Sequence, residues 1–307
     1  MKVIVTGSSG MLGRQVFKTL ESMPGVTAVP VDRVTVDLAD AVATSRYFAS
    51  VAADAVIHTA AHVGDIGERV ERPGSFLTTN LRIDDSVISA ALDNGVRRLL
   101  YISSAGVYPQ DCPQPITPDA LLTGPIEGPM EPYALAKIVG MKRCEYAKRE
   151  HGVQYTSIVP TNMYGEGEET NLKTAHLVPA ALGKVHAAKE SGAPSVEVWG
   201  DGTARRELMF APDAGAWLAQ IAASDVQLPD ALHLGSGDEM TVREIYERVC
   251  EVVAYEGELA FDTSKPSGVA QRVLDSSAAN ALGFTNHTSF DEGLGQSYQH
   301  YLAIASA

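Results

Sequence analysis

The sequence predicts an α/β fold, with a doubly wound parallel sheet followed by a smaller, interwoven C-terminal lobe. Over residues 1–162 short apolar runs alternate with helical patterns, and small or polar residues follow several of these runs. Strands that alternate with helices form parallel sheets, whose carboxyl ends meet at one edge. Beyond residue 162 the alternation loosens. We therefore expect one domain at residues 1–162 and a second lobe at residues 163–307, with some later segments returning to the first domain.

Composition narrows the function classes. At 307 residues the chain can bury a large core, and 45% hydrophobic with 20% charged residues is ordinary for a globular protein. The net charge of −14 argues against nonspecific nucleic-acid binding, which needs clustered Lys and Arg. The three scattered cysteines form no CxxC pair and support neither a disulfide framework nor a zinc site. With no signal-peptide pattern and no apolar run of ~18 residues, we expect a cytoplasmic protein without a membrane partner.

The first expected strand, at residues 2–6, leads into a glycine turn at residues 7–13 and a helical pattern to about Leu20. In this context glycines let the backbone approach a pyrophosphate, whose charge lies at the helix N-terminus. The GxxGxxG spacing departs from the commoner GxGxxG, but its place after the first strand favours a Rossmann-type dinucleotide site. The residues expected at the cofactor here are Gly7, Ser9, Gly10, Met11, Leu12 and Gly13.

The second expected strand, at residues 26–31, bears on the choice of cofactor. It ends at Asp32, about twenty residues beyond the glycine turn, where an acid binds the adenosine ribose of NAD(H). Arg33 could instead face the 2′-phosphate of NADP(H). The two signals conflict, so NAD(H) is favoured and NADP(H) stays open. Asp37 and Leu38 are expected near the adenine.

Three further expected strands, at residues 54–59, 97–103 and 154–159, end in residues that suit a bound cofactor. His58 and His62 lie on a strand and its exit loop rather than on one helix face, so we predict no metal site. The remaining residues expected along the cofactor are Ala60, Ala61, His62, Asn80, Ser103, Pro160 and Asn162.

A helix entered at Pro132 and running to about His151 carries the predicted chemistry. Tyr133 and Lys137 lie one turn apart on it, on the same face. A lysine cation beside a tyrosine favours the phenolate and lowers its pKa from ~10 toward the working range. Tyr133 could then exchange a proton with an oxygen on the carbon that exchanges hydride. An ordinary surface helix is the alternative, because one such pair is weak evidence alone.

The later half of the chain supplies basic residues in an acidic background. Two or three of them could bind a diphosphate-bearing substrate, and scattered surface charge is the alternative. They are Lys173, Lys184, Arg205, Arg206, Lys265 and Arg272. The remaining expected elements are helices at residues 76–93, 175–191 and 242–253, and strands at residues 196–199 and 231–234.

With the glycine turn, Ser104 and the Tyr133–Lys137 pair, the chain resembles the extended short-chain dehydrogenase/reductase family, and within it the GDP-L-fucose synthases. The likeness extends over nearly the whole chain, through residues 60–64, 131–138, 160–165, 176–180, 198–200 and 264–266. The resemblance implies a hydride-transfer triad of Ser104, Tyr133 and Lys137, with His176 as a further acid–base group. It also implies a nucleotide-sugar substrate, with a GDP-sugar favoured, and a homodimer. The residues it assigns to the substrate are Ser104, Ala105, Gly106, Asn162, His176, Lys184, Trp199, Arg206 and Lys265; plain core packing is the alternative for Trp199.

Two residues depart from the family pattern. Gly106 stands where the family has its epimerising cysteine, so one of the two groups that C3/C5 epimerisation needs is missing. Cys112 could replace it, although an ordinary loop cysteine is the simpler interpretation. Ser9 stands where the synthases carry an arginine that meets the 2′-phosphate, which together with Asp32 favours NAD(H).

The leading hypothesis is an NAD(P)-dependent oxidoreductase that reduces a nucleotide 4-keto-(6-deoxy) sugar at C4. The alternatives are an NAD-dependent nucleotide-sugar 4-epimerase and a full 3,5-epimerase/4-reductase. A cofactor-sensing binding protein would use the same fold without chemistry, but the complete set of Ser104, Tyr133 and Lys137 disfavours it.

Overall fold

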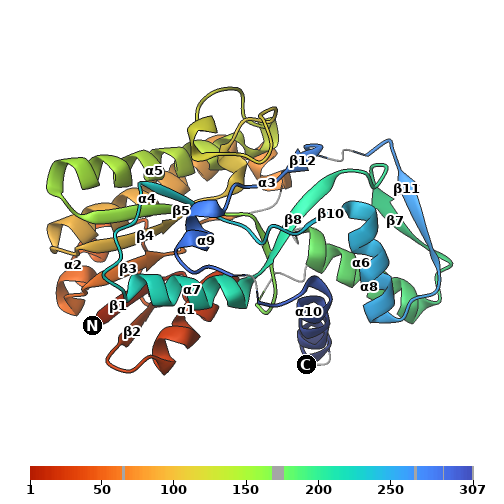
Figure 1. Cartoon of the computed structure of the whole chain (residues 1–307), viewed down its shortest axis with the longest axis horizontal. Helices are drawn as coiled ribbons and strands as arrows, with labels where there is room; N and C mark the ends of the chain where they lie inside the picture. Colours follow the sequence, from red (N-terminus) through yellow and green to blue (C-terminus); the bar gives the residue numbers. More distant parts are fainter. Residues whose placement is uncertain (64–65, 168–175, 266–267, 286, 306–307) are drawn as a thin grey trace.

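The larger part of the computed structural model is a six-stranded parallel sheet (Figure 1). The structure describes residues 1–63, 66–167, 176–265, 268–285 and 287–305. Strand order is β2-β1-β3-β4-β5-β9. These strands are β1 (Lys2–Thr6), β2 (Thr27–Val31), β3 (Ala55–His58), β4 (Arg98–Ile102), β5 (Gln154–Pro160) and β9 (Ala231–Leu234). The predicted doubly wound α/β sheet is confirmed.

Helices cover both faces of this sheet, which explains why its central strands β1, β3 and β4 are buried along almost their whole length. Along β1, Ile4 packs into one core and Val3 and Val5 into the other. The first core lies under α2 (Ala41–Val51), α4 (Pro73–Asp93) and α5 (Glu131–His151). The second lies under α1 (Met11–Ser22) and α7 (Ala211–Ala222). Helix α7 and strand β9 therefore come from beyond residue 162 but belong to the large sheet and the helices that cover it.

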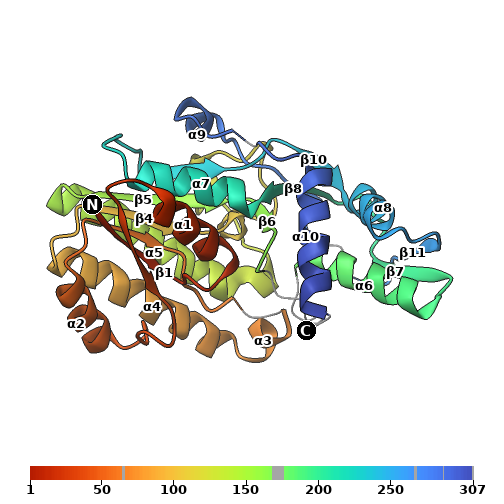
Figure 2. The ribbon, with the colours of Figure 1, turned by 90° about the horizontal axis from the view of Figure 1, so that it is seen from below.

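A smaller part contains a four-stranded sheet, a two-stranded sheet and a third core. The strands are β6 (Asn162–Tyr164), β8 (Arg205–Phe210), β10 (Glu239–Thr241) and β12 (Gln271–Arg272), with β7 (Ser195–Trp199) paired to β11 (Glu258–Asp262). The helices are α6 (Leu177–Ser191), α8 (Val242–Val253) and α10 (Phe290–Ala305). In both views α10 stands where the two parts meet (Figure 2).

Short elements complete the described chain: α3 (Ile66–Glu71), α9 (Ser277–Ala281) and the 3-10 turns η1 (Ala105–Val107), η2 (Pro118–Ala120) and η3 (Gly128–Met130). Within these described ranges, no helix combines the length and the apolar character needed to cross a bilayer.

The sequence pattern located the early strands and the Tyr133 helix but not every element. It gave no signal for α2, α7, α10 or β8. Helix α7 is rich in alanine and apolar on most sides, so it lacks the polar stripe that marks a surface helix. Strand β8 begins with two arginines, which interrupt the apolar pattern expected of a buried strand. Helix α4 begins at Pro73, earlier than residue 76, because proline suits the first helical turn.

Candidate active site

The glycine turn joins β1 to α1 at the carboxyl edge of the large sheet. Gly7 has φ +68°, and a Cβ there would lie 2.8 Å from the Ala60 backbone. A Cβ at Gly13 would collide with the Gly7 carbonyl oxygen. These two glycines are therefore required by the packing of the chain itself.

Gly10 differs, because its backbone conformation suits any residue and an added Cβ would meet only one close neighbour among the described residues. Its φ is an ordinary −77°, and the nearest atom that an added Cβ would meet is the Gly7 carbonyl oxygen at 3.3 Å. Gly10 and Ser9 are exposed at the N-terminus of α1. A bare, positive helix end with an open glycine fits the pyrophosphate of a dinucleotide. Leu12 is buried in the core, and Met11 is half-buried.

Asp32 lies after β2, at the same edge of the sheet. Its Oδ1 accepts the N–H groups of Val34 and Thr35 at 3.0 and 2.9 Å, and the Thr35 hydroxyl at 2.9 Å. The bonds from Thr35 and Val34 lower the pKa of Asp32, so it remains a carboxylate. Arg33 and Asp37 are exposed, whereas Leu38 is buried in the core. These bonds hold the carboxylate at the end of β2, and its charged form can accept ribose hydroxyls.

Two residues expected along the cofactor are held by hydrogen bonds within the protein. The fully buried Asn80 side chain accepts the His62 N–H at 2.9 Å and donates to the carbonyls of His62 and Phe76. Ser103 is buried and donates to the Met141 sulfur at 3.2 Å. Asn80 and Ser103 therefore shape the loops at the edge of the sheet. Ala60, Ala61 and His62 are half-buried, Pro160 is buried and Asn162 is exposed.

Tyr133 and Lys137 are both buried on α5, one turn apart as predicted. The Lys137 Nζ lies 5.9 Å from the centre of the Tyr133 ring and 3.3 Å from Asp84 Oδ1. Burial raises the pKa of Tyr133, Lys137 and Arg69 lower it, and Asp84 raises it. Lys137 acts in the predicted direction, but the prediction that the Tyr133 pKa falls toward the working range is wrong. Burial outweighs the effect of Lys137, so the Tyr133 pKa lies above its ordinary value.

Ser104 precedes η1 and is half-buried, and its Oγ accepts the Gly106 N–H at 3.1 Å. A Cβ at Gly106 would lie 2.7 Å from the methyl carbon of Met130, 3.4 Å from Ser104 Oγ and 3.9 Å from Arg272 Nη1. The Met130 methyl group therefore occupies the space that a side chain at position 106 would need. Ala105 and Gly106 are themselves buried.

Arg69 is a site residue that sequence reasoning missed. It is 7% exposed on α3, and its Nη1 donates to the Met130 sulfur at 2.7 Å. Its guanidinium carbon lies 5.9 Å from the centre of the Tyr133 ring. The surrounding protein desolvates His176, and this desolvation, together with the Arg69 charge, lowers the pKa of His176. The structure thus brings Arg69, Met130, Tyr133 and His176 to one side of the site.

The residues expected at the nucleotide lie on the smaller part. Lys184 Nζ donates to the Glu197 carbonyl at 3.2 Å and lies 5.3 Å from the centre of the Trp199 ring. Trp199 is 49% exposed, so the core-packing alternative for it is wrong. Lys265 is exposed, and Lys173 lies outside the described residues.

The two arginines at the start of β8 have different surroundings. Arg206 Nη1 donates to the carbonyls of Arg205 and Val269 at 2.7 and 2.8 Å, which fixes the guanidinium. Arg272 lies beside it in the register of β8 and β12. Arg205 instead pairs with Glu239 at 2.8 Å. Arg206 and Arg272 are therefore the neighbouring cations of this sheet edge.

No metal-binding group of three or more His, Cys, Asp or Glu side chains occurs in the part of the chain that the structure describes. His58 is fully buried and bonded to Thr6 and Asp84. The His62 ring lies 4.8 Å from the Phe76 ring, centre to centre, and is tilted by 45° to it.

The chain is similar to known proteins over most of its length. The model of a family described as the NAD dependent epimerase/dehydratase family matches residues 3–235. The chain is 35% identical over 309 residues to a GDP-L-fucose synthase of Escherichia coli (strain K12), with coverage of 98% of this chain and 96% of that protein. It is 32% identical over 303 residues to a GDP-L-colitose synthase of Yersinia pseudotuberculosis, with 98% of each covered. A solved GDP-mannoheptose C4 reductase from Campylobacter jejuni with NADP bound gives a TM-score of 0.85 at 26% identity, with 98% of each chain covered.

Proposed function

The chain belongs to the NAD dependent epimerase/dehydratase family, and we propose that it is an oxidoreductase that reduces a nucleotide 4-keto-(6-deoxy) sugar at C4. The observation that carries the proposal is the buried Tyr133–Lys137 pair on α5, together with the half-buried Ser104 at the start of η1, which packs against α5. The relatives are named for GDP-sugars, which favours GDP as the nucleotide. Little or no epimerisation at C3 and C5 is part of the proposal.

The three residues would divide the work at C4. Ser104 Oγ hydrogen-bonds the C4 oxygen, and Tyr133 gives that oxygen a proton. Lys137 orients the cofactor ribose and the tyrosine. A bound nicotinamide supplies the hydride. The raised pKa of Tyr133 keeps the phenol protonated at neutral pH, which is the form that reduction requires.

The surroundings of Gly106 support the absence of epimerisation. Moving a proton from one face of a carbon to the other requires two groups. At position 106 there is no side chain, and the Met130 methyl group fills the space. Burial raises the pKa of Cys112, whose Sγ donates to the Pro109 carbonyl oxygen at 3.6 Å, so this thiol stays protonated and cannot take a proton from carbon. His176 remains as a single acid–base group.

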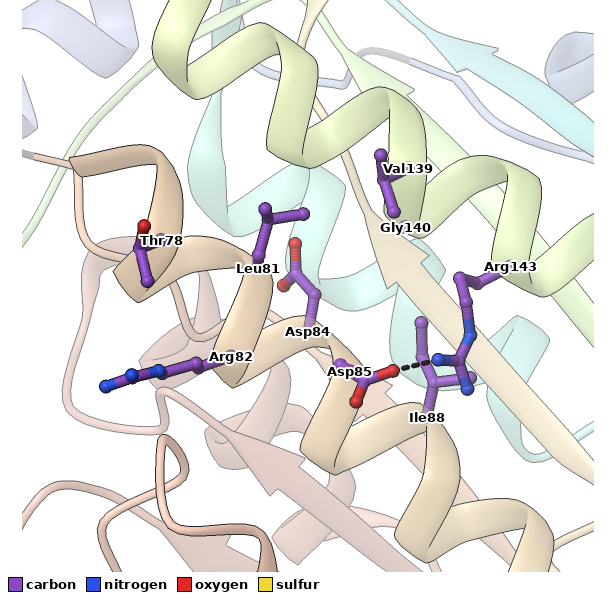
Figure 3. Close-up of a pocket in the computed structure, with 9 residues that line it drawn as sticks. All are labelled: Thr78, Leu81, Arg82, Asp84, Asp85, Ile88, Val139, Gly140 and Arg143. Atoms are coloured by element: carbon purple, nitrogen blue, oxygen red, sulfur yellow. Dashed lines mark hydrogen bonds and ion pairs between the residues drawn. The ribbon is translucent and has the colours of Figure 1, made fainter. Parts of the chain in front are cut away.

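The proposal also includes the choice of cofactor and the oligomeric state. Asp32 and the exposed Ser9 support NAD(H), while the solved reductase with NADP bound keeps NADP(H) as the alternative. We also propose a homodimer through α4 and α5, because Leu135 and Val139 of α5 are 39% and 47% exposed. Val139 lines a pocket between these two helices (Figure 3). The residues before 163 would bind the cofactor, and most later ones the substrate.

A substrate panel tests the function. GDP-, UDP-, CDP- and dTDP-linked 4-keto sugars are incubated with NADH or NADPH in D₂O, and the products are analysed by NMR. We expect stoichiometric oxidation of NADH with a GDP-4-keto sugar, and no deuterium at C3 or C5. The corresponding 4-hydroxy sugars are incubated in parallel without added cofactor, and inversion at C4 there would show a 4-epimerase instead. Deuterium at C3 and C5 would show that epimerisation proceeds despite Gly106.

A further inference from the structure

A buried carboxylate that the proposed mechanism does not use lies beneath Tyr133. Asp84 of α4 is 2% exposed and receives three donors. Its Oδ2 accepts the Tyr101 hydroxyl at 2.6 Å, and its Oδ1 lies 3.0 Å from His58 Nε2 and 3.3 Å from Lys137 Nζ. In the described part of the chain, Asp84 is the anion that pairs with Lys137.

The protonation states of this network follow from its partners. Burial lowers the pKa of His58, so the imidazole is neutral. Burial alone would raise the pKa of Asp84, but Lys137, His58 and Tyr101 together hold it below its ordinary value. Because a carboxylate only accepts, His58 carries its proton on Nε2, and its Nδ1 accepts the Thr6 hydroxyl at 2.6 Å. Thr6 precedes Gly7, so the network runs from the glycine turn to Lys137.

Stability does not explain why this carboxylate is buried. Desolvation of an ion pair cancels most of its attraction, and apolar residues of similar volume commonly replace such pairs without loss. The chain nevertheless accommodates the pair closely: a Cβ at Gly140 would collide with the Tyr101 hydroxyl that reaches Asp84. The Lys137 ammonium also lies 4.7 Å from the centre of the Tyr101 ring. These contacts hold Lys137 in one position.

The charge of Asp84 acts on Tyr133 in the opposite sense to that of Lys137. The charged groups that act on Tyr133 are Lys137 on α5, Arg69 on α3 and Asp84 on α4. The titratable groups that face Asp84 from the neighbouring elements are His58, Tyr101, Tyr133, Lys137 and Cys144, with His176 beside Arg69. Removing Asp84 would leave two cations and no anion near the phenol.

We propose that Asp84 is a positioning residue, which holds the Lys137 ammonium beneath Tyr133 and offsets part of its charge so that Tyr133 remains a proton donor. The proposal rests on the proposed C4 reduction and deepens it. It also accounts for the links from Asp84 to His58 and Tyr101, which orient the carboxylate from two further strands.

The next residue offers a matched control. Asp85 lies in the same cleft between α4 and α5 but is directed toward Arg143, with which it pairs at the surface (Figure 3). Its side chain is 57% exposed, against 3% for Asp84. Asp85→Asn therefore removes the same charge from the same helix without touching Lys137.

The experiment compares Asp84→Asn, Asp85→Asn and wild type. Loss of a nearby negative charge favours the phenolate, so Asp84→Asn is expected to lower the pKa of Tyr133 by about one unit. The alkaline decline of kcat for reduction then begins at a pH lower by about one unit. Because Lys137 is no longer held beneath Tyr133, kcat at neutral pH also falls about tenfold, while KM for the nucleotide sugar is unchanged. Asp85→Asn should match wild type in each respect.

A second measurement needs no substrate. Ultraviolet difference titration of each variant, with and without Tyr133→Phe, isolates the ionisation of Tyr133 in the free protein. It separates failure of this proposal from failure of the proposed function. An unchanged Tyr133 titration and an unchanged alkaline decline in Asp84→Asn would overturn the positioning role.

A variant that keeps the charge covers the case in which Asp84→Asn does not fold. Asp84→Glu retains the carboxylate on a longer side chain, which displaces Lys137. We expect an alkaline decline at the wild-type pH with kcat about tenfold lower. A wild-type kcat in this variant, or a shifted alkaline decline, would contradict the proposal.

Discussion

The two ends of the candidate site are built in opposite ways. At the chemical end, Tyr133, Lys137 and Asp84 are 9%, 1% and 2% exposed and lie on long helices that cover the large sheet. At the nucleotide end, Trp199 is 49% exposed and Lys265 is exposed, on the smaller part. Burial fixes geometry and strengthens electrostatic effects, whereas exposed residues can collect a ligand from solvent. Substitutions at the first end should therefore change kcat, and substitutions at the second end should change KM.

The largest expected effect is that of Tyr133→Phe. Loss of the proton donor is expected to lower kcat about 10³-fold, with KM and NADH affinity nearly unchanged. Single-turnover oxidation of NADH measures the first quantity and fluorescence titration the second. Tyr146→Phe is the control, because Tyr146 is 46% exposed on the same helix and should leave kcat intact. Near-normal turnover of Tyr133→Phe would show that Tyr133 is not the proton donor and that the chemical step occurs elsewhere.

Arg206→Ala should have the next largest effect, and on KM. Its guanidinium is fixed by the carbonyls of Arg205 and Val269, which suits contact with a diphosphate. We expect KM for the nucleotide sugar to rise about 30-fold, with kcat changed less than about threefold. Arg205→Ala is the control, because Arg205 is engaged by Glu239. A fall in kcat at unchanged KM would mean that the two ends are not separate.

The same contrast explains what sequence could predict. The glycine turn and the Tyr133–Lys137 pair are local patterns, so their elements were predictable from spacing alone. Asp84 and Asp85 are adjacent acids on a predicted helix. The spacing of four from Asn80 and Ile88 puts Asp84 on the buried face, but it does not show that Asp84 pairs with Lys137. Arg69 and Met130 meet through a hydrogen bond between residues far apart in the chain. Such contacts depend on how helices pack, which residue spacing along one helix does not encode.

The smallest expected effect is that of Trp199→Ala, and it tests the nucleotide end most directly. Because Trp199 is half exposed, its loss should change the free energy of unfolding by less than about 0.5 kcal/mol. KM should rise about fivefold, since the ring and the Lys184 ammonium 5.3 Å from its centre would no longer form one surface for the nucleotide.

The other tryptophan supplies the control for this last prediction. Trp217 is 5% exposed on α7 and packs against Phe284 at 5.7 Å. Trp217→Phe should lower the melting temperature and leave KM unchanged, the reverse of Trp199→Ala. Thermal unfolding and steady-state kinetics on both variants measure the contrast. If Trp199→Ala destabilises the fold and leaves KM unchanged, the exposed ring belongs to the structure of the smaller part, and the nucleotide must be bound elsewhere.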